Sequence, residues 1–383
     1  ESDATLYDAG FRYNQFKGAG LDLRFQTLSG AECKYEITEW NPAGESHVWV
    51  NIPTLSVGDK VVMRWGNSDA VEPEYAFNGD AWAGYFGVYH LDDAIGDAYD
   101  SSPANNDLIQ VPGNLPSSAA GVVKGARHTN KNSNQGFEKA NINGGSTAGQ
   151  FTVSTWMSND SDLQDWKNWW GMQLNGANIN DTSKHIRLEV DGGNTPNIYA
   201  TGVSALAHDY ASTAVSGGNW FHVVATIGGG KARIYVDGAA DGIETAFTDS
   251  SPITGIRIGR GWDRGSVGTT IDEITFSSSV RDVEWAKATY ENQKIGSTYV
   301  TYDNLKGPPV FEGSTDVYGK VGEAMIPVVQ GVIGGGTLTF SAVGLPPGLS
   351  INTNTGEITG TPNATGDFNS TITVTVMVRE KTV

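Results

Sequence analysis

The sequence predicts an all-β protein with two or three domains. Its 383 residues exceed the usual size of a single β-sandwich. Glycine occurs 49 times and aromatic residues make up 10% of the chain, a composition that favours short strands and many turns over long helices. Near the end of the chain, residues 371–376 alternate Thr with Ile or Val, which is the period-two pattern of a half-buried strand.

Four extended runs predict a small β domain over residues 1–80. In order they contain DLRF, EITEW, WVNIP and RWGN, and the turn signals LSG, NPAG and SVG separate them. This order resembles the domain of unknown function that commonly precedes a laminin-G-like module in bacterial surface proteins. Members of that family carry an earlier strand pair, which we do not find before Asp22.

Residues 81–296 carry a longer set of motifs. They are GVYHLDDAIGDAYDSSPANNDL, FTVSTWM, WFHVVATI, KARIYVDGAADG, ITGIRIGRGWD and TTIDEITFSSSVRDVEWAKATYENQ. Their order resembles a laminin-G-like, concanavalin A-type jelly-roll sandwich. The pair Asp237-Gly238 after an alternating run predicts a tight hairpin. One amphipathic helix is expected over Val283–Asn292, with Asp282 as its N-cap.

Residues 306–383 resemble the immunoglobulin-like module that bacterial surface proteins string together in series. The stretch Gly344–Thr361 combines two prolines, which cannot donate ladder hydrogen bonds, with asparagines and glycines suited to tight turns. The run STYVTY at 297–302 alternates like a strand. It suggests that residues 297–305 complete the first domain and that the sandwich is inserted into it.

Bulk charge and cysteine content narrow the class of protein. The chain has 25 basic and 43 acidic residues, a net charge of −18, so a polyanion such as nucleic acid would be repelled. Cys33 is the single cysteine and forms no intramolecular disulfide. No apolar span is long enough to cross a bilayer, and no signal peptide precedes Glu1. The resemblances imply an extracellular protein, secreted or on a bacterial cell surface.

An acidic turn is the candidate metal site. Residues 92–107 contain seven Asp or Asn side chains, and oxygen ligands of this kind suit calcium. The first choices are Asp93, Asp100, Asn105 and, from a later strand, Asp272. The alternative is a solvated loop in which Asp and Asn only form turns. Scattered histidines and one cysteine argue against zinc.

Two aromatic loops are candidate sugar sites, because sugar rings stack on flat aromatic side chains while charged groups bind their hydroxyls. The loop DSDLQDWKNWW contains Asp165 and Trp166, and one of its last tryptophans, Trp169 or Trp170, is more consistent with a core position, because alternate residues of a strand face inward. The second loop contributes Arg260, Trp262 and Asp263.

Catalysis is the rival function, since concanavalin A-type folds also host glycoside hydrolases and polysaccharide lyases. Laminarinase-like hydrolases carry two glutamates on one face of a strand, and the chain lacks that pattern. The adjacent acids Asp272 and Glu273 should face opposite sides of a regular strand. Lyases of this fold need His, Tyr and Arg or Gln together, which His185, Arg187 and Tyr199 would provide only by chance.

The sequence therefore favours a non-enzymatic, extracellular region that binds a glycan through the sandwich loops, with calcium supporting the loops. The flanking modules would position it, as in a bacterial adhesin. A surface protein is a second possible partner. A structural spacer without a ligand, or a polysaccharide hydrolase or lyase, remains the alternative.

Overall fold

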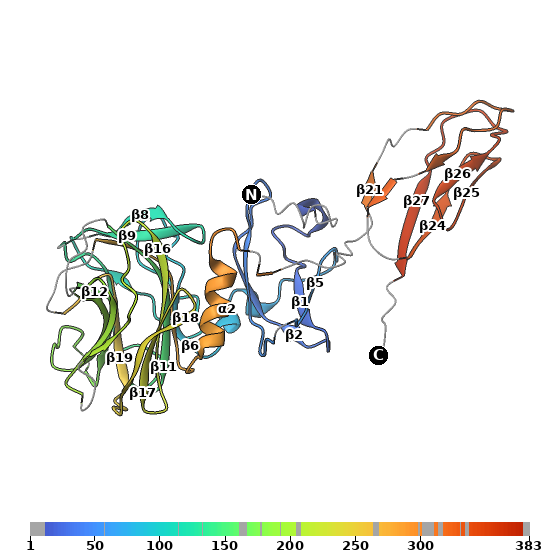
Figure 1. The fold of residues 1–383 in the computed structure, drawn as a ribbon. Coiled ribbons are helices and arrows are strands. Elements are labelled where there is room, and N and C mark those ends of the chain that lie inside the picture. Colours follow the sequence, from blue (N-terminus) through green and yellow to red (C-terminus); the bar gives the residue numbers. More distant parts are fainter. Residues whose placement is uncertain are drawn as a thin grey trace. The chain divides into compact units, whose positions relative to one another are not determined.

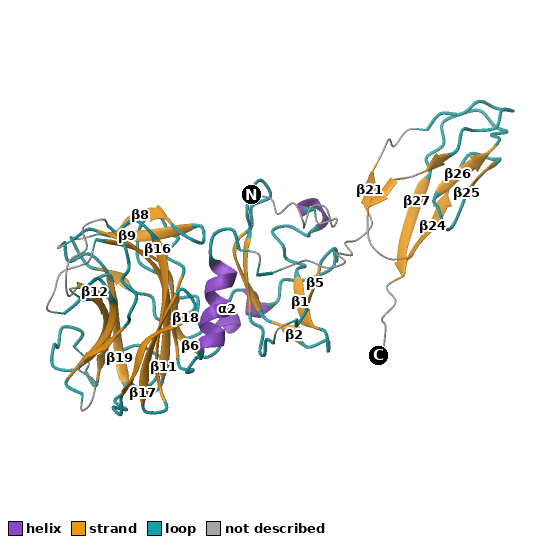
Figure 2. Cartoon of the chain, in the orientation of Figure 1, coloured by secondary structure: helices purple, strands orange, loops and turns teal. Residues whose placement is uncertain are grey.

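A computed structural model of the chain describes residues 12–377 (Figure 1). It leaves out residues 57, 114, 132, 161–166, 177, 192, 204–207, 263–267, 298, 301–309, 313–316, 330 and 334–336. The chain divides into two units, residues 74–300 and residues 1–73 with 301–383. Strands dominate both units, as Figure 2 shows, so the all-β prediction is confirmed.

The larger unit is a sandwich of two antiparallel sheets (Figure 1). The first sheet has seven strands in the order β15 (His208–Tyr210), β14 (Pro196–Thr201), β13 (His185–Val190), β12 (Lys167–Leu174), β19 (Ile253–Ile258), β10 (Phe137–Ala140) and β7 (Ile109–Gln110). The second has the order β18 (Ala239–Ala246), β17 (Lys231–Val236), β16 (Trp220–Gly228), β11 (Phe151–Asn159), β20 (Thr269–Ser277), β9 (Gly125–Thr129) and β8 (Ser117–Ala120), and β6 (Tyr85–Tyr89) also pairs with β20.

One continuous apolar core fills the space between the two sheets. Trp169 and Trp170 both lie in it, although neighbours in a regular strand face opposite sides. A β-bulge between Asn168 and Trp170 breaks the alternation and lets both indoles stay buried. Trp169 donates a hydrogen bond to Asn159 Oδ1 at 3.0 Å, so its buried N–H is satisfied.

The predicted hairpin and helix are both present. Asp237 and Gly238 have φ angles of 49° and 77° between β17 and β18, as a primed hairpin turn requires. Helix α2 spans Val283–Gln293, and Asp282 caps it by accepting a hydrogen bond from the Trp285 backbone N–H at 2.9 Å. Ala286 is fully buried and packs with Val224 and Tyr235 of the second sheet.

The N-terminal part, residues 12–73, contains the four predicted runs as short strands. They are β1 (Arg24–Thr27), β3 (Tyr35–Glu39), β4 (His47–Val50) and β5 (Val61–Arg64), and the structure adds a two-residue strand, β2 (Glu32–Cys33), beside β1. The buried Asp22 carboxylate accepts hydrogen bonds from the backbone N–H groups of Lys17, Gly66 and Asn67. This explains why the motifs DLRF and RWGN occur together: Asp22 of the first motif binds the backbone of the turn in the last.

The described residues also form short 3₁₀ helices, which are η1 (Tyr13–Gln15), η2 (Glu74–Ala76) and η3 (Asp80–Trp82). No helix in the described ranges is both long and apolar enough to cross a membrane.

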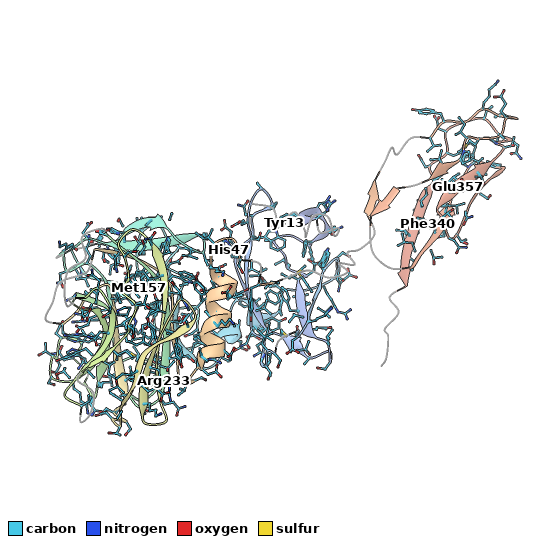
Figure 3. All side chains as sticks on the ribbon, in the orientation of Figure 1. Tyr13, His47, Met157, Arg233, Phe340 and Glu357 are labelled. Carbon is cyan, nitrogen blue, oxygen red and sulfur yellow. The ribbon has the colours of Figure 1, made fainter. Side chains whose placement is uncertain are left out.

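The C-terminal module forms small antiparallel sheets. They are made by β21 (Val310–Glu312) with β23 (Gly331–Ile333), by β22 (Val328–Val329), β26 (Glu357–Gly360) and β25 (Leu349–Ile351), and by β24 (Thr337–Val343) with β27 (Thr371–Met377). Phe340 and Ile358 are buried, and Thr373 is exposed between half-buried neighbours, as the alternation predicts. Figure 3 shows Phe340 and Glu357 on this module.

The expected strand at 297–302 is not seen where it can be checked. Tyr299 and Val300 lie in a bend, and residues 298, 301 and 302 are outside the described ranges. Insertion of the sandwich into the first domain, and the domain boundaries proposed from the sequence, therefore stay predictions.

A buried histidine links the second sheet to helix α2. His222 is fully buried, and its Nε2 shares a hydrogen bond of 2.8 Å with Ser154 Oγ. Trp156 and Tyr290 of α2 pack against its ring at 5.1 and 6.2 Å. Burial lowers the pKa of His222 from 6.5 to about 3, because no charged group compensates the lost water.

We expect His222 to make the sandwich sensitive to acid. Above pH 6.5 the ring is neutral in both states; below it, the unfolded chain binds a proton that the folded chain rejects until about pH 3. Stability should fall by about 3 kcal/mol between pH 6.5 and pH 4. Urea unfolding at both pH values should show this loss shrinking in His222→Gln, and an equal loss in parent and variant would contradict the assignment.

Candidate functional site

Strand β13 places charged side chains on a face that is usually exposed to water. Its sequence HIRLEV alternates three apolar core residues with His185, Arg187 and Glu189 on the outer face. All three are at most 2% exposed. The seven-stranded sheet is therefore buried on both faces around β13, with an apolar inner face and a polar outer one.

Strand register extends this polar face into rows across the sheet. One row runs through Glu138, Arg257, Gly171, Arg187 and Tyr199, each directly opposite the next on neighbouring strands. Residues paired in this way project to the same side of a sheet. The polar face thus collects side chains from five strands, and its composition could not be read from any one segment of the sequence.

A second row contains Asn168, Glu189 and Asn197. Asn197 Nδ2 donates to Glu189 Oε1 at 3.1 Å. Asn168 is fully buried, and neither its amide nitrogen nor its oxygen has a hydrogen-bond partner. An unsatisfied buried amide costs on the order of 1–3 kcal/mol, so this position is destabilising unless something else binds it.

Arg187 is the centre of the network on β13. Its Nε lies 2.8 Å from Glu189 Oε2, and its Nη1 donates to His185 Nε2 at 3.1 Å. The guanidinium also lies over the ring of Tyr199, 4.3 Å from the ring centroid. Such pairing is what allows an arginine to be almost fully buried.

Arg257 and Arg260 form a second charged cluster with Glu138. Arg257 Nε is 3.1 Å and Arg260 Nη1 is 3.3 Å from the same oxygen, Glu138 Oε2. Arg257 also donates to Gly261 O and to Asn180 Oδ1. Burial is the main cause that lowers the pKa of Arg257 to about 10; the charge of Glu138 opposes this shift, and that of Arg260 contributes to it.

Trp262 lies over Arg257 and Gly171 of the first row and over His185. Its ring is stacked on His185 with centroids 4.3 Å apart and planes inclined by 15°, and Arg257 lies 4.8 Å from its centroid. The indole N–H donates to Ile179 O at 2.7 Å. A Cβ on Gly171 would come within 2.2 Å of the indole, so only glycine leaves room for the ring here. Trp262 itself is partly exposed.

The predicted sugar-binding residues fall partly within this site. Trp262 and Arg260 are brought beside Arg257, whereas Asp165, Trp166 and Asp263 lie outside the described residues. The structure also assembles His185, Arg187 and Tyr199, a grouping that the sequence left to chance. Sequence reasoning missed Glu189, Arg257 and Asn168. The alternation of polar and apolar residues in HIRLEV was the sequence signal that could have identified Glu189.

The structure gives the predicted metal ligands contacts within the protein. Asp100 is engaged by hydrogen bonds from the backbone N–H groups of Val88, Ser102 and Asn106, and Asn105 adopts a turn conformation with φ of 54°. Within the described ranges, no three His, Cys, Asp or Glu side chains are arranged to hold a metal. The acidic turn instead packs against Arg127, which donates to Gly96 O at 2.8 Å and partly offsets the raised pKa of Asp93, whose main cause is burial.

Asp272 and Glu273 do not alternate as a regular strand requires, so the prediction that they face opposite sides is wrong. A bulge in the pairing of β11 with β20 falls at this point, and Glu273 has a φ of 49°. Glu273 Oε2 lies 2.8 Å from His90 Nδ1. Burial and then the charge of Glu273 raise the pKa of Asp272 well above its usual value. Both acids are buried within the second sheet, away from the polar rows.

Two segments match known protein families. Residues 132–286 match the concanavalin A-like lectin/glucanases superfamily, and residues 308–378 match the family described as "Putative Ig domain". The chain therefore carries one concanavalin A-like module and one Ig-like module, as its sequence motifs indicate. No curated protein matches the chain.

Several solved structures are distantly similar. Domain 4 of AbnA, an extracellular arabinanase from Geobacillus stearothermophilus, is 15% identical with a TM-score of 0.43, covering 53% of this chain and 96% of that one. Trypanosoma rangeli sialidase with sialic acid is 15% identical with a TM-score of 0.43, covering 64% and 36%. A pentraxin from Limulus polyphemus is 13% identical with a TM-score of 0.32, covering 41% and 75%. The chain thus spans about a third of the sialidase.

We expect Gly171→Ala to displace Trp262 from the polar face, because the added methyl group would overlap the indole. The indole N–H resonance of Trp262 should shift as its bond to Ile179 O is lost. Gly193→Ala is the matched control, since its Cβ would approach nothing closer than 3.4 Å. An unchanged Trp262 resonance in Gly171→Ala would show that the ring does not lie where the structure places it.

Proposed function

We propose that the sandwich unit binds a glycan on the polar face of the seven-stranded sheet. The observation that carries the proposal is the position of Trp262, a partly exposed indole held over His185 and Arg257 on the polar face. A glycan needs this combination, because its ring stacks on an aromatic surface while its hydroxyls exchange hydrogen bonds with charged and amide groups.

The energetic cost of burying charged side chains on this face also supports a binding role for it. A sandwich needs only its inner sheet faces to be apolar, and exposed outer faces are solvated without loss. Here Arg187, Arg257 and Glu189 are taken out of water, which is costly even when the charges are paired. A buried polar network of this kind can orient groups for a ligand.

The neighbouring modules support an extracellular setting. The Ig-like module at 308–378 and the concanavalin A-like module are types typical of extracellular proteins. In this proposal the modules on either side of the sandwich present it at a bacterial surface, as part of an adhesin. A surface protein is a second possible partner. A spacer without a ligand would have no reason to hold an aromatic ring over a buried polar face.

Binding should depend on the tryptophans. We expect Trp262→Ala, and independently Trp166→Ala, to lower glycan-array binding by about two- to tenfold, in line with the roughly 0.5–1.5 kcal/mol typical of an aromatic stacking contact. Trp285→Ala is the control, because this residue lies on helix α2 outside the site. Thermal melts should show that all variants fold. Undiminished binding by both loop variants would place the ligand elsewhere.

Calcium support of the loops is the part of the proposal that concerns the acidic turn. Asp272 Oδ1 is buried without a hydrogen-bond partner, and Asp93 is close enough to Asp92 and Arg127 for its pKa to respond to their charges. Asp272 thus retains an acceptor oxygen without a partner, whereas Asp100 is engaged by backbone N–H groups.

A chelator should lower the melting temperature of the protein, and added calcium should restore it, because a ligand that binds only the folded state stabilises it. The shift should be lost in Asp272→Asn. Identical melting curves with chelator and with calcium would remove the metal from the proposal.

A second candidate function is polysaccharide cleavage by elimination. The observation that favours it is the contact of His185, Arg187 and Tyr199 on one sheet face, with Gln173 directly opposite His185. A base and an acid next to a guanidinium are the groups that remove a proton beside a sugar carboxylate and protonate the leaving oxygen. Ultraviolet absorbance of the unsaturated product tests it: appearance with the parent but not with His185→Asn would establish a lyase, and no product from any uronate polymer would exclude one.

A further inference from the structure

Charge is not balanced in the cluster beneath Trp262. Arg257 and Arg260 together carry two positive charges, and both contact one carboxylate oxygen, Oε2 of Glu138. Arg257 Nε reaches that oxygen at 3.1 Å, whereas Arg260 Nε is buried with no hydrogen-bond partner. Among the described residues, the two guanidinium groups therefore share one carboxylate, and one positive charge is not matched at this point of the polar face.

The surplus is local. The chain as a whole has a net charge of −18, so no general basic surface accounts for two arginines at one acid. Arg187, by contrast, has its own carboxylate in Glu189. An uncompensated guanidinium in a water-poor site is unfavourable, and an anion placed there would gain more than it would in water because the local dielectric is low.

The cluster can be reached by a ligand. The side chains of Arg260 and Glu138 are 12% and 24% exposed, while Arg257 behind them is 1% exposed. Trp262 adjoins Arg257 at 4.8 Å, so a ring stacked on the partly exposed indole would bring a substituent within reach of the guanidinium groups. A planar carboxylate is the anion that an arginine binds best, through two parallel hydrogen bonds.

We infer that the site selects glycans bearing a carboxylate, such as uronic acids, and that Arg260 is the residue that binds the carboxylate while Arg257 supports it from behind. This inference rests on the proposed glycan-binding function and adds to it the class of sugar. When no ligand is bound, the Glu138 carboxylate takes the role of the ligand carboxylate and holds the two arginines in place. Burial makes the charged form of Arg257 less favourable, and the negative charge of a bound carboxylate should oppose this effect.

The test compares acidic glycans with neutral copies of themselves. Oligosaccharides containing galacturonate, glucuronate, mannuronate or sialic acid, each paired with its carboxyl-reduced form, are titrated calorimetrically against the full chain. At least one acid should bind about tenfold or more tightly than its reduced form, since a charge-assisted hydrogen bond contributes about 1.5–3 kcal/mol, equivalent to about 10- to 100-fold.

Three variants separate charge recognition from folding. Arg260→Gln should lose the preference for the acid while keeping affinity for the reduced form. Glu138→Gln should bind the acid more tightly than the parent, because the competing carboxylate is gone. Arg233→Gln is the matched control, as it removes the same charge from an arginine paired with Glu244 in the second sheet, and it should behave as the parent.

The outcomes distinguish this inference from the function on which it rests. Binding of reduced glycans as tightly as acidic ones, or an unchanged preference in Arg260→Gln, would overturn the carboxylate assignment and leave glycan binding intact. Failure of every acidic and neutral glycan to bind would overturn the glycan function and this inference with it.

Discussion

Burial of the seven-stranded sheet on both faces is the constraint on which the rest of the sandwich depends. The inner face packs into one continuous apolar core with the second sheet, and the outer face carries charges and amides that are equally buried around β13. Polar groups in such a place must bind one another. Alternation along β13 places Arg187 beside Glu189, and strand register places Arg257 opposite Glu138.

Two irregularities allow this sheet pair to depart from simple alternation. The bulge in β12 buries two successive tryptophans and leaves Asn168 on the polar face without a partner. The bulge opposite Glu273 turns that acid towards His90 and couples it to Asp272. In both cases one extra residue changes which face a side chain joins, and the change cannot be seen in a period-two pattern.

The site and the core are connected through glycine. Gly171 belongs to β12, whose neighbours Trp170 and Met172 fill the core, and its missing side chain provides the surface on which Trp262 rests. Stability of the sandwich and the position of its exposed indole thus rely on the same strand. The acidic turn is organised differently, by backbone N–H groups donating to Asp100 and by contact with Arg127.

The sequence by itself determined the fold class, the two family modules, the Asp237-Gly238 hairpin and the capped helix α2, because each depends on neighbouring residues: alternation, turn geometry or an N-cap. It also singled out Trp262 and Arg260. Only the tertiary structure decided that Arg257, Arg187 and Glu138 share a face with them, since these residues come from strands far apart in the chain and meet through register. Register depends on bulges and on core packing over the whole sheet, which no local pattern contains.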